Sequence, residues 1–451
     1  MSPDPNAFSA VEAARKIRDG ILTSVDLVKA CLARIDQTDG QLKAWAHLNP
    51  EHALKQAEEL DAIRQAGQPM GALHGVPVGL KDIIDTSDFP TERGTPVYTG
   101  RQPDHDATLV NHLREAGAVI LGKTATTEFA FLHPTETRNP HNLDYAPGGS
   151  SSGSAAAVAA FHVPLAIGTQ TGGSVIRPAS FCGTYGFKPT RGVISRQGVL
   201  RTSTTLDHVG VFARTLEDVA LLTDAIAGYD PRDPSSYPRA RPNMLAGSRA
   251  DVPVEPQFAY FDLPFNDRLT ESAREGVDEM VEALGGQVER LPISDNMVGL
   301  TDIHQTIQNY ELCRHLEVEY NQHRDLLSEE VQSVIEKGRK ISLDEYTEAC
   351  DIQLSAAAYF KEFFADYDAI IAPSAVGEAP KFGMGTGDPI FCIIWTLCGL
   401  PSLNLPLLVG EHDLPIGVQL IGASEEDDRL MRTANWVLNE LRSDTTPEPR
   451  S

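Results

Sequence analysis

Cysteine is scarce in this sequence, and no clustered metal-binding motif is present. The six cysteines are scattered over 451 residues, none of them forms a CxxC pair, and no HExxH motif occurs. Disulfide frameworks and structural zinc sites require closely spaced cysteines or histidines. The sequence therefore excludes a disulfide-stabilised scaffold, and we expect a protein that uses neither a metal nor another cofactor.

Positive charge is also in deficit. The chain has 38 Lys and Arg against 63 Asp and Glu, which gives a formal net charge of −25 at pH 7. A protein with this charge repels nucleic-acid phosphates and anionic lipid headgroups. The composition therefore predicts a globular protein that binds neither nucleic acid nor a membrane surface.

The sequence lacks a recognisable secretory signal and an uninterrupted apolar helix. Its N-terminal residues have no basic stretch followed by an apolar one, so we expect a cytoplasmic protein. Residues 389–410 carry no charge and are long enough to cross a bilayer, but Pro401, Asn404 and Pro406 interrupt any single helix. This stretch predicts a buried helix followed by a buried strand.

Short apolar runs separated by glycines predict a buried β-sheet. Strands are expected at Val76–Leu80, Ala118–Leu121 and Val163–Ile167, between segments with helical periodicity. Strands that consist of continuous apolar runs are typically covered on both faces by helices. The pattern therefore predicts an α/β fold.

The chain divides at a proline-rich stretch. Residues 229–257 contain six prolines and few apolar residues, which predicts a connector between a catalytic part, 1–228, and a C-terminal part, 258–443. The C-terminal part begins with a strand, a helix and a second strand, a β-α-β unit, and continues as a helical region. Because later strands can return to the first sheet, we predict one composite domain over 1–443, followed by a flexible tail, 444–451.

Two loops rich in glycine and serine flank one of the expected strands. They read GGSSSGS at 148–154 and GTQTGGS at 168–174. Either loop alone is also consistent with an ordinary tight turn or with a phosphate-binding nest, although no GK[ST] follows as in a P-loop. Two such turns around one buried strand indicate backbone donors and hydroxyls that converge on one point, as oxyanion stabilisation in acyl transfer requires.

A serine nucleophile needs a base, and Lys81 is the strongest candidate. The histidines have no obvious aspartate partner by spacing. Lys81 ends an apolar, strand-like run, and burial lowers the pKa of a lysine until its neutral form can accept a proton. The alternative is that Lys81 pairs with Asp82 at the end of a strand.

These motifs resemble the amidase signature family over nearly the whole chain. The matching segments include GGSSSGSAAAVAA at 148–160, GTQTGGSVIRPASFCG at 168–183 and FKPTRGVISRQG at 187–198, with Lys81 upstream. The resemblance implies the fold of that family, an α/β architecture with a large mixed β-sheet core covered on both sides by α-helices. It also implies an amidase that uses a Ser-Ser-Lys triad.

Each member of the family triad has a matching position in this chain. The resemblance implies that Ser174 is the nucleophile that forms an acyl-enzyme, and that Lys81 is the general base. Ser150 then relays the proton between them and is held by a cis peptide bond. The implied oxyanion hole consists of four backbone N–H groups, those of Thr171, Gly172, Gly173 and Ser174.

The chain departs from the commoner family pattern beside the nucleophile. Gln170 stands where many members have an acidic residue, and the arginine after the nucleophile comes three residues later, as Arg177, instead of two. This variant resembles a malonamidase-like branch in which the arginine binds a substrate carboxylate. Alternatively, Arg177 packs within the loop. We expect Arg177, Ser151 and Thr169 to contact the substrate.

The sequence-based hypothesis is a free-standing hydrolase of amides, anilides or carbamates (urethanes), with small dicarboxylic monoamides such as malonamate as the alternative substrates. The A-type component of a tRNA-dependent amidotransferase is disfavoured by Gln170, by the shifted Arg177 and by the acidic charge. The predicted partner is a small amide or carbamate alone, with a homodimer left open. Five aromatic residues of the helical region are candidates for the pocket wall: Tyr310, Tyr320, Tyr359, Phe360 and Phe363.

Overall fold

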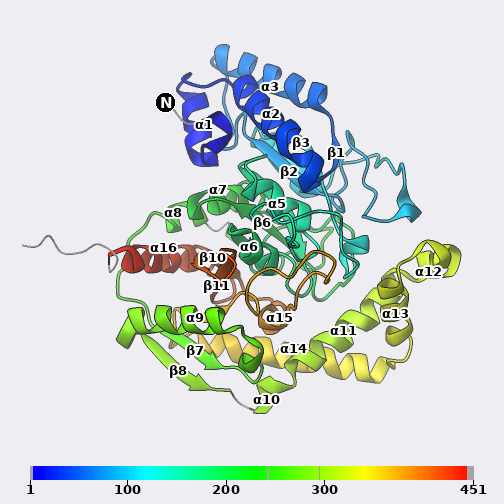
Figure 1. The fold of residues 1–451 in the computed structure, drawn as a ribbon, viewed down its shortest axis with the longest axis vertical. Coiled ribbons are helices and arrows are strands. Elements are labelled where there is room, and N and C mark those ends of the chain that lie inside the picture. The colour runs from blue at the N-terminus through cyan, green and yellow to red at the C-terminus, as the bar shows by residue number, and fades with distance from the viewer. Residues whose placement is uncertain (1–3, 241–242, 294, 444–451) are drawn as a thin grey trace, which may run out of the picture.

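One mixed β-sheet runs through the molecule (Figure 1). The structure, a computed structural model, describes residues 4–240, 243–293 and 295–443. In this part of the chain eleven strands pair in the order β1-β3-β2-β4-β6-β5-β10-β11-β9-β7-β8. The strands are β1 (Trp45–Leu48), β2 (Pro77–Lys81), β3 (Val119–Thr124), β4 (Leu165–Gln170), β5 (Tyr185–Lys188), β6 (His208–Ala213), β7 (Phe258–Asp262), β8 (Val288–Pro292), β9 (Ala369–Pro373), β10 (Ser402–Val409) and β11 (Pro415–Ile421).

Helices cover both faces of the sheet. Alternate residues of a strand point to opposite sides, so a strand buried on both faces packs in two separate clusters. In β4, Leu165 and Ile167 pack in one apolar cluster with α4 and α7, whereas Ala166 packs in another with α3 and α5. The expected helix-covered mixed sheet is thereby confirmed. The helices are α1 (Ala10–Arg18), α2 (Ser24–Leu42), α3 (Pro50–Gln65), α4 (Thr108–Glu115), α5 (Ser152–Ala159), α6 (Ile176–Cys182), α7 (Leu216–Ile226), α8 (Met244–Gly247), α9 (Glu271–Leu284), α10 (Asp295–Val298), α11 (Leu300–His315), α12 (Glu317–His323), α13 (Glu329–Gly338), α14 (Leu343–Phe363), α15 (Ile390–Leu397) and α16 (Asp427–Ser443).

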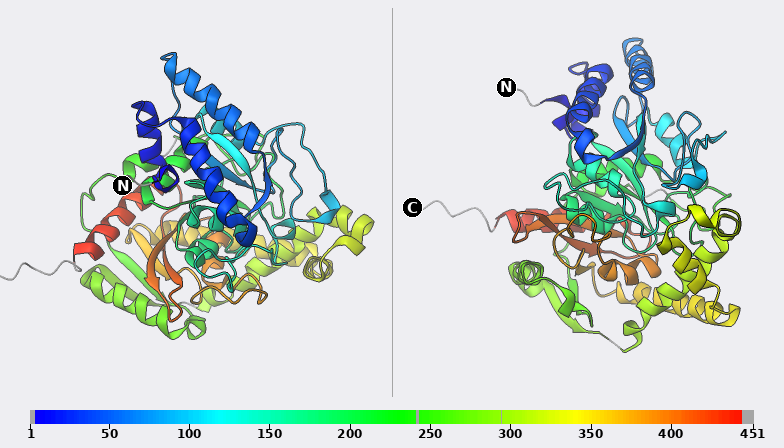
Figure 2. Two further views of the ribbon diagram at one scale, coloured as in Figure 1. Left: turned by 45° about the horizontal axis from the view of Figure 1, so that its top comes forward. Right: turned by 45° about the vertical axis from the view of Figure 1, so that its right-hand side comes forward.

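The part of the chain after the proline-rich stretch completes the same sheet. β10 pairs with both β5 and β11, so strands from the two sides of residues 229–257 are hydrogen-bonded neighbours. The expected β-α-β unit is present as β7, α9 and β8, with β7 and β8 parallel. Figure 2 shows the N-terminal helices, in blue, at the end of the molecule opposite this unit, in green. The single composite domain remains a prediction.

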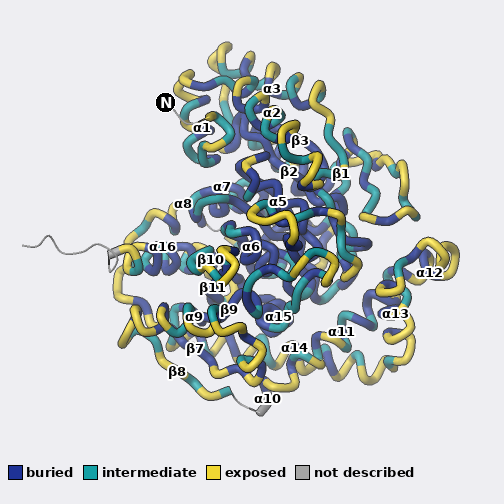
Figure 3. The backbone as a smooth tube through the Cα atoms, viewed as in Figure 1, coloured by how far each residue is buried: buried dark blue, intermediate teal, exposed yellow. Residues whose placement is uncertain are grey.

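Burial follows this layered arrangement. The central strands are almost entirely buried, whereas most residues of α12 and α14 are exposed (Figure 3). The stretch 389–410 forms α15 and then β10, as predicted, and the side-chain amide of Asn404 donates to the carbonyl oxygen of Thr184 at 2.7 Å. Among the described residues, no helix is long and apolar enough to cross a bilayer. The predicted tail, 444–451, lies outside the described residues.

Candidate active site

Three chain segments meet at the carboxyl ends of two neighbouring strands. β2 and β4 are parallel, with Leu80 paired to Ile167, so Lys81 at the end of β2 lies beside the last residues of β4. The turn 171–175 leads from β4 into α6, and the Gly/Ser loop 148–151 leads into α5. Both predicted loops therefore start or end next to Lys81.

Lys81 is surrounded by hydroxyl groups. Its side chain is fully buried, and its Nζ atom lies 2.6 Å from Ser150 Oγ, 2.8 Å from Thr169 Oγ1 and 3.1 Å from Ser151 Oγ. Three hydroxyls from two different segments thus converge on one amine. Ser151 and Thr169, which the sequence placed near a substrate, contact Lys81 in the structure.

The acidic neighbour of Lys81 is engaged elsewhere. Asp82 Oδ1 lies 3.3 Å from Nζ of Lys123, a residue of β3 whose Nζ also donates to Thr91 Oγ1 at 2.6 Å. The alternative that Lys81 pairs with Asp82 is therefore wrong. Among the described residues, the hydrogen-bond partners of Lys81 are three hydroxyls, and no carboxylate forms an ion pair with its Nζ atom.

Burial favours the neutral form of Lys81. Removal from water lowers the pKa of Lys81 well below its usual range, and the carboxylate of Asp207 opposes this shift only in part. A neutral amine has two N–H donors and one lone pair. The hydroxyl of Ser151 already donates to the carbonyl oxygen of Thr169 at 3.1 Å, so its proton is not free for that lone pair. Ser150 makes the shortest contact and is the better proton source.

Ser150 links the lysine to the turn that carries Ser174. The backbone N–H of Ser150 donates to Ser174 Oγ at 3.2 Å; Ser150 is 1% exposed, whereas Ser174 is half-buried. Gly148 and Gly149 before it have φ angles of 79° and 61°, a region that favours glycine. The cis peptide bond expected at Ser150 is not found, since the described residues contain none; the two left-handed glycines turn the chain instead.

Gln170 holds the turn 171–175 from inside. Its Oε1 atom accepts from the backbone N–H groups of Val175 and Ile176, at 2.8 and 3.0 Å, and its Nε2 atom donates to Thr396 Oγ1 at 2.9 Å. The side chain is 1% exposed. A carboxylate could accept the first two bonds but could not donate the third. The glutamine at this position therefore supports the turn.

Arg177 also has a partner within the protein. It is 2% exposed, its Nη1 atom donates to the carbonyl oxygen of Gly387, and burial lowers its pKa to about 10. Its Cδ atom lies 3.3 Å from where a Cβ on Gly387 would stand, so the guanidinium stem fills the space under that loop. The geometry favours packing within the loop over contact with a substrate carboxylate.

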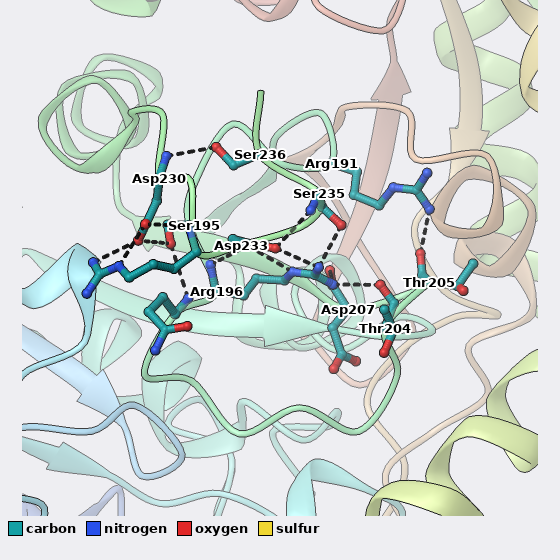
Figure 4. A network of polar contacts seen from close by, with 12 residues as sticks. Arg191, Ser195, Arg196, Thr204, Thr205, Asp207, Asp230, Asp233, Ser235 and Ser236 are labelled. Atoms are coloured by element: carbon teal, nitrogen blue, oxygen red, sulfur yellow. Dashed lines mark hydrogen bonds and ion pairs between the residues drawn. The ribbon is translucent and has the colours of Figure 1, made fainter. Parts of the chain in front are cut away.

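A buried polar network around Arg196 (Figure 4) reaches the turn 171–175 through Asp207. Thr171 Oγ1 donates to Asp207 Oδ1 at 2.6 Å, and Arg196 Nη1 donates to the carbonyl oxygen of Asp207 at 3.2 Å. Arg196 Nη2 in turn lies 2.8 Å from Oδ1 of Asp233, in the proline-rich stretch. Sequence reasoning missed this role of the stretch, because nothing local in its composition indicates it.

Two of the five aromatic candidates line a cavity. Tyr359 and Phe360 face a space of about 480 Å³ together with Leu300 and Ile303 of α11, and Ser174 is not among its lining residues. Within the described residues, no group of three or more His, Cys, Asp or Glu is placed to hold a metal ion. The other three aromatics contact neighbours: Tyr310 stacks on Tyr346, Phe363 stacks on Tyr367, and Tyr320 donates to Glu336.

Known proteins with similar sequences share one family. The family profile described as "Amidase" matches residues 26–431. The glutamyl-tRNA(Gln) amidotransferase A chain of Alkaliphilus metalliredigens is 33% identical, over 93% of this chain and 93% of its own. Seven further curated relatives, between 32% and 34% identical, are the same component of that amidotransferase in other organisms.

Solved structures agree. A chain from a vestigial protein complex that reveals the origins of an s-triazine catabolic enzyme is 29% identical, with a TM-score of 0.90 over 96% of this chain and 99% of its own. The peptide amidase of Stenotrophomonas maltophilia is also 29% identical, with a TM-score of 0.83 over 99% of both chains. Fold and relatives together define an enzyme of amide C–N chemistry. The chain belongs to the amidase signature family.

Two of the sequence-based interpretations are wrong. The free-standing hydrolase and the small molecule as sole partner, without nucleic acid, conflict with the relatives, which are named as subunits of an amidotransferase that acts on glutamyl-tRNA(Gln). In the sequence alone, Gln170 and Arg177 disfavour an amidotransferase component. Both side chains are buried and hydrogen-bonded within the protein, so they do not argue against that class. The charge of −25 describes the surface of this chain, not that of an assembly.

Proposed function

We propose that this chain is the amide-cleaving A subunit of an amidotransferase assembly. In this proposal Ser174 is the nucleophile, Ser150 is the proton relay and Lys81 is the base. One observation carries the proposal. Nζ of the fully buried Lys81, which has no carboxylate partner among the described residues, lies 2.6 Å from Ser150 Oγ, and the backbone N–H of Ser150 donates to Ser174 Oγ. Activation of a serine by a base through a relay requires the relay residue to lie next to both groups. The bond from the Ser150 N–H holds Ser174 Oγ beside Ser150, whose own hydroxyl is the group that would carry the proton to Lys81.

The proposed reaction has two stages. Ser174 Oγ attacks the carbonyl carbon of a primary carboxamide while its proton passes through Ser150 to the neutral amine of Lys81. The tetrahedral intermediate then collapses, the C–N bond breaks, the proton returns to the leaving nitrogen, and ammonia departs. Water attacks the resulting ester by the same relay and releases the carboxylic acid, which regenerates the free hydroxyl of Ser174.

The surrounding residues have supporting roles in this proposal. The N–H groups of Thr171, Gly172, Gly173 and Ser174 stabilise the oxyanion. Ser151 and Thr169 orient the lysine by accepting its two N–H groups, and so leave its lone pair directed at Ser150. Arg177 supports the loop.

The assembly accounts for the relatives and for the charge. An amidotransferase needs a source of ammonia, and a serine amidase site that cleaves a carboxamide donor provides one. The acidic surface of this chain disfavours direct contact with RNA phosphates. In the proposed arrangement other subunits bind the RNA, and this chain supplies the ammonia.

Glutamine tests this function as the carboxamide donor. Purified chain, alone and with the other subunits of a glutamyl-tRNA(Gln) amidotransferase, is incubated with L-glutamine, and ammonia and glutaminyl-tRNA are measured. We expect Ser174-dependent ammonia release, with transfer to glutamyl-tRNA(Gln) only in the presence of the other subunits. Absence of ammonia release from glutamine in both preparations would refute the proposal. The Ser174→Ala variant reports the background.

The rate of amide cleavage should rise with pH and then level off. The ammonium form of Lys81 has no lone pair, and burial sets its pKa below the usual lysine range, so the active form predominates above that lowered value. The measurement is kcat/KM against pH. Asp207 raises the pKa of Lys81, so Asp207→Asn should move the rising limb to lower pH. A shift in the opposite direction, or a rate that declines steadily from acid to neutral pH, would contradict the assignment of Lys81.

A further inference from the structure

Two carbonyl groups of the turn 171–175 accept hydrogen bonds from side chains of helices that are distant in the sequence. The carbonyl oxygen of Thr171 accepts from Nε2 of His304 in α11 at 2.8 Å. The carbonyl oxygen of Gly172 accepts from the hydroxyl of Thr396 in α15, also at 2.8 Å. His304 is 2% exposed and Thr396 is fully buried, so solvent does not compete for either bond.

These bonds fix the direction of two N–H groups. In a trans peptide the C=O and N–H point in opposite directions, and every peptide bond of the described residues is trans. A carbonyl of Thr171 held toward α11 therefore directs the N–H of Gly172 away from α11. In the same way, a carbonyl of Gly172 held toward α15 directs the N–H of Gly173 away from α15.

The N–H groups of Gly172 and Gly173 have no acceptor among the described residues. Neither Gly172 nor Gly173 donates a backbone hydrogen bond to any described residue. Buried or half-buried N–H groups are nearly always paired, so two adjacent ones without a protein partner indicate donors kept for a ligand. A Cβ at Gly173 would lie 3.0 Å from Pro389 and 3.2 Å from Cys392, which shows how closely α15 approaches the turn.

His304 and Thr396, called the anchors below, are themselves held in place. Thr396 Oγ1 accepts from Nε2 of Gln170 at 2.9 Å, and its hydroxyl proton is shared between the carbonyl oxygens of Gly172 and Cys392. Burial lowers the pKa of His304 to about 4, so its ring is neutral at pH 7. A neutral imidazole has one N–H, and it lies on Nε2 because that atom faces a carbonyl.

We propose that His304 and Thr396 are positioning residues of the oxyanion hole, which hold the carbonyl groups of Thr171 and Gly172 so that the N–H groups of Gly172 and Gly173 face the oxyanion. The inference rests on the proposed function of Ser174. Its consequence is that α11 and α15, both from the C-terminal part of the chain, determine the geometry of a catalytic turn built by the N-terminal part.

The test compares two pairs of variants. Thr396→Val removes the hydroxyl at nearly constant volume, and Thr396→Ser keeps it; His304→Ala removes the donor, and His304→Gln keeps an N–H at similar reach. Removal of an oxyanion donor costs ~10²–10³-fold in rate, so loss of an anchor should cost roughly 10- to 100-fold in kcat. KM should change by less than about threefold, because the interaction belongs to the transition state.

Two remote contacts of the same chemistry serve as controls. His74 Nε2 bonds to the carbonyl oxygen of Leu60 at 2.9 Å, and Thr223 Oγ1 donates to that of Val219 at 2.7 Å, both buried. His74→Ala and Thr223→Val should lose stability to a similar degree without the loss in kcat. If Thr396→Val and His304→Ala affect catalysis no more than these controls, the inference is wrong. Should His304→Ala fail to fold, the Thr396 pair decides alone.

A fluorophosphonate probe separates this inference from the function on which it rests. The probe labels an activated serine independently of the natural substrate, and its reaction also develops negative charge on oxygen. Wild type that is not labelled at Ser174 contradicts the proposed function. Wild type that is labelled, together with Thr396→Val labelled at an equal rate, contradicts only the positioning role. The expected result is labelling slowed about tenfold or more in Thr396→Val and His304→Ala, and restored in Thr396→Ser and His304→Gln.

Discussion

Replacement of Ser174 by alanine is expected to abolish measurable amide cleavage, with a loss of roughly 10⁴- to 10⁶-fold in kcat. Without the hydroxyl no acyl-enzyme can form, and the remaining oxyanion donors stabilise only a direct attack by water. The fold should persist, because Ser174 Oγ makes only one hydrogen bond to the part of the chain that the structure describes, with the backbone N–H of Ser150. Ammonia release from L-glutamine and the thermal midpoint are measured on the same preparation.

Ser152 provides a matched control for this variant. It lies two residues after Ser150, is 3% exposed, and its Oγ atom bonds to Thr135 Oγ1 at 3.0 Å, away from Lys81. Ser152→Ala should keep kcat within a few-fold of wild type. A folded Ser174→Ala protein that retains wild-type activity would eliminate Ser174 as the nucleophile.

Removal of the proton relay should produce the second largest effect. Lys81→Met and Ser150→Ala are each expected to lower kcat by roughly 10³-fold or more, and the double variant should be little worse than either single one. Both residues act in one chain of contacts, since Nζ of Lys81 lies 2.6 Å from Ser150 Oγ. Without Lys81 the proton has no acceptor, and without Ser150 it cannot reach Lys81.

Lys123 is the control for the loss of a buried lysine. It is fully buried on β3, the neighbour of β2, and bonds to Asp82 and Thr91 instead of the serines. Lys123→Met should lower the free energy of unfolding while kcat of the folded protein falls less than about tenfold. Losses from Lys81→Met and Ser150→Ala that add fully in the double variant would show that the two residues act independently.

The fold was largely predictable because its strands are buried on both faces. Apolar runs bounded by glycine located β2, β3 and β4 to within two or three residues. Pro401 correctly separated α15 from β10, whereas Pro406 lies within β10. The order of strands was not predictable. That β10 inserts beside β5, far back in the chain, depends on pairing between distant segments, which no local pattern encodes.

The loops around the site were predictable, but the residues behind them were not. Glycine and serine spacing located the turns that meet at Lys81, since close approach of backbone there demands glycine. His304 and Thr396 lie on ordinary helices, without any motif, and reach the turn only through tertiary packing. Gln170 was misleading about function because it replaces the acidic residue that many family members have at this position, whereas in the structure its side chain bonds to the turn itself.

The central claim is that cleavage proceeds through an acyl-enzyme on Ser174. The most direct measurement is tandem mass spectrometry of protein quenched in acid during turnover of L-glutamine, with fragment ions that distinguish Ser174 from Ser150 and Ser151. We predict a glutamyl group esterified to Ser174 in the wild type and absent from Ser174→Ala. An acyl group on Ser150 or Ser151, or continued turnover in Ser174→Ala, would contradict the account.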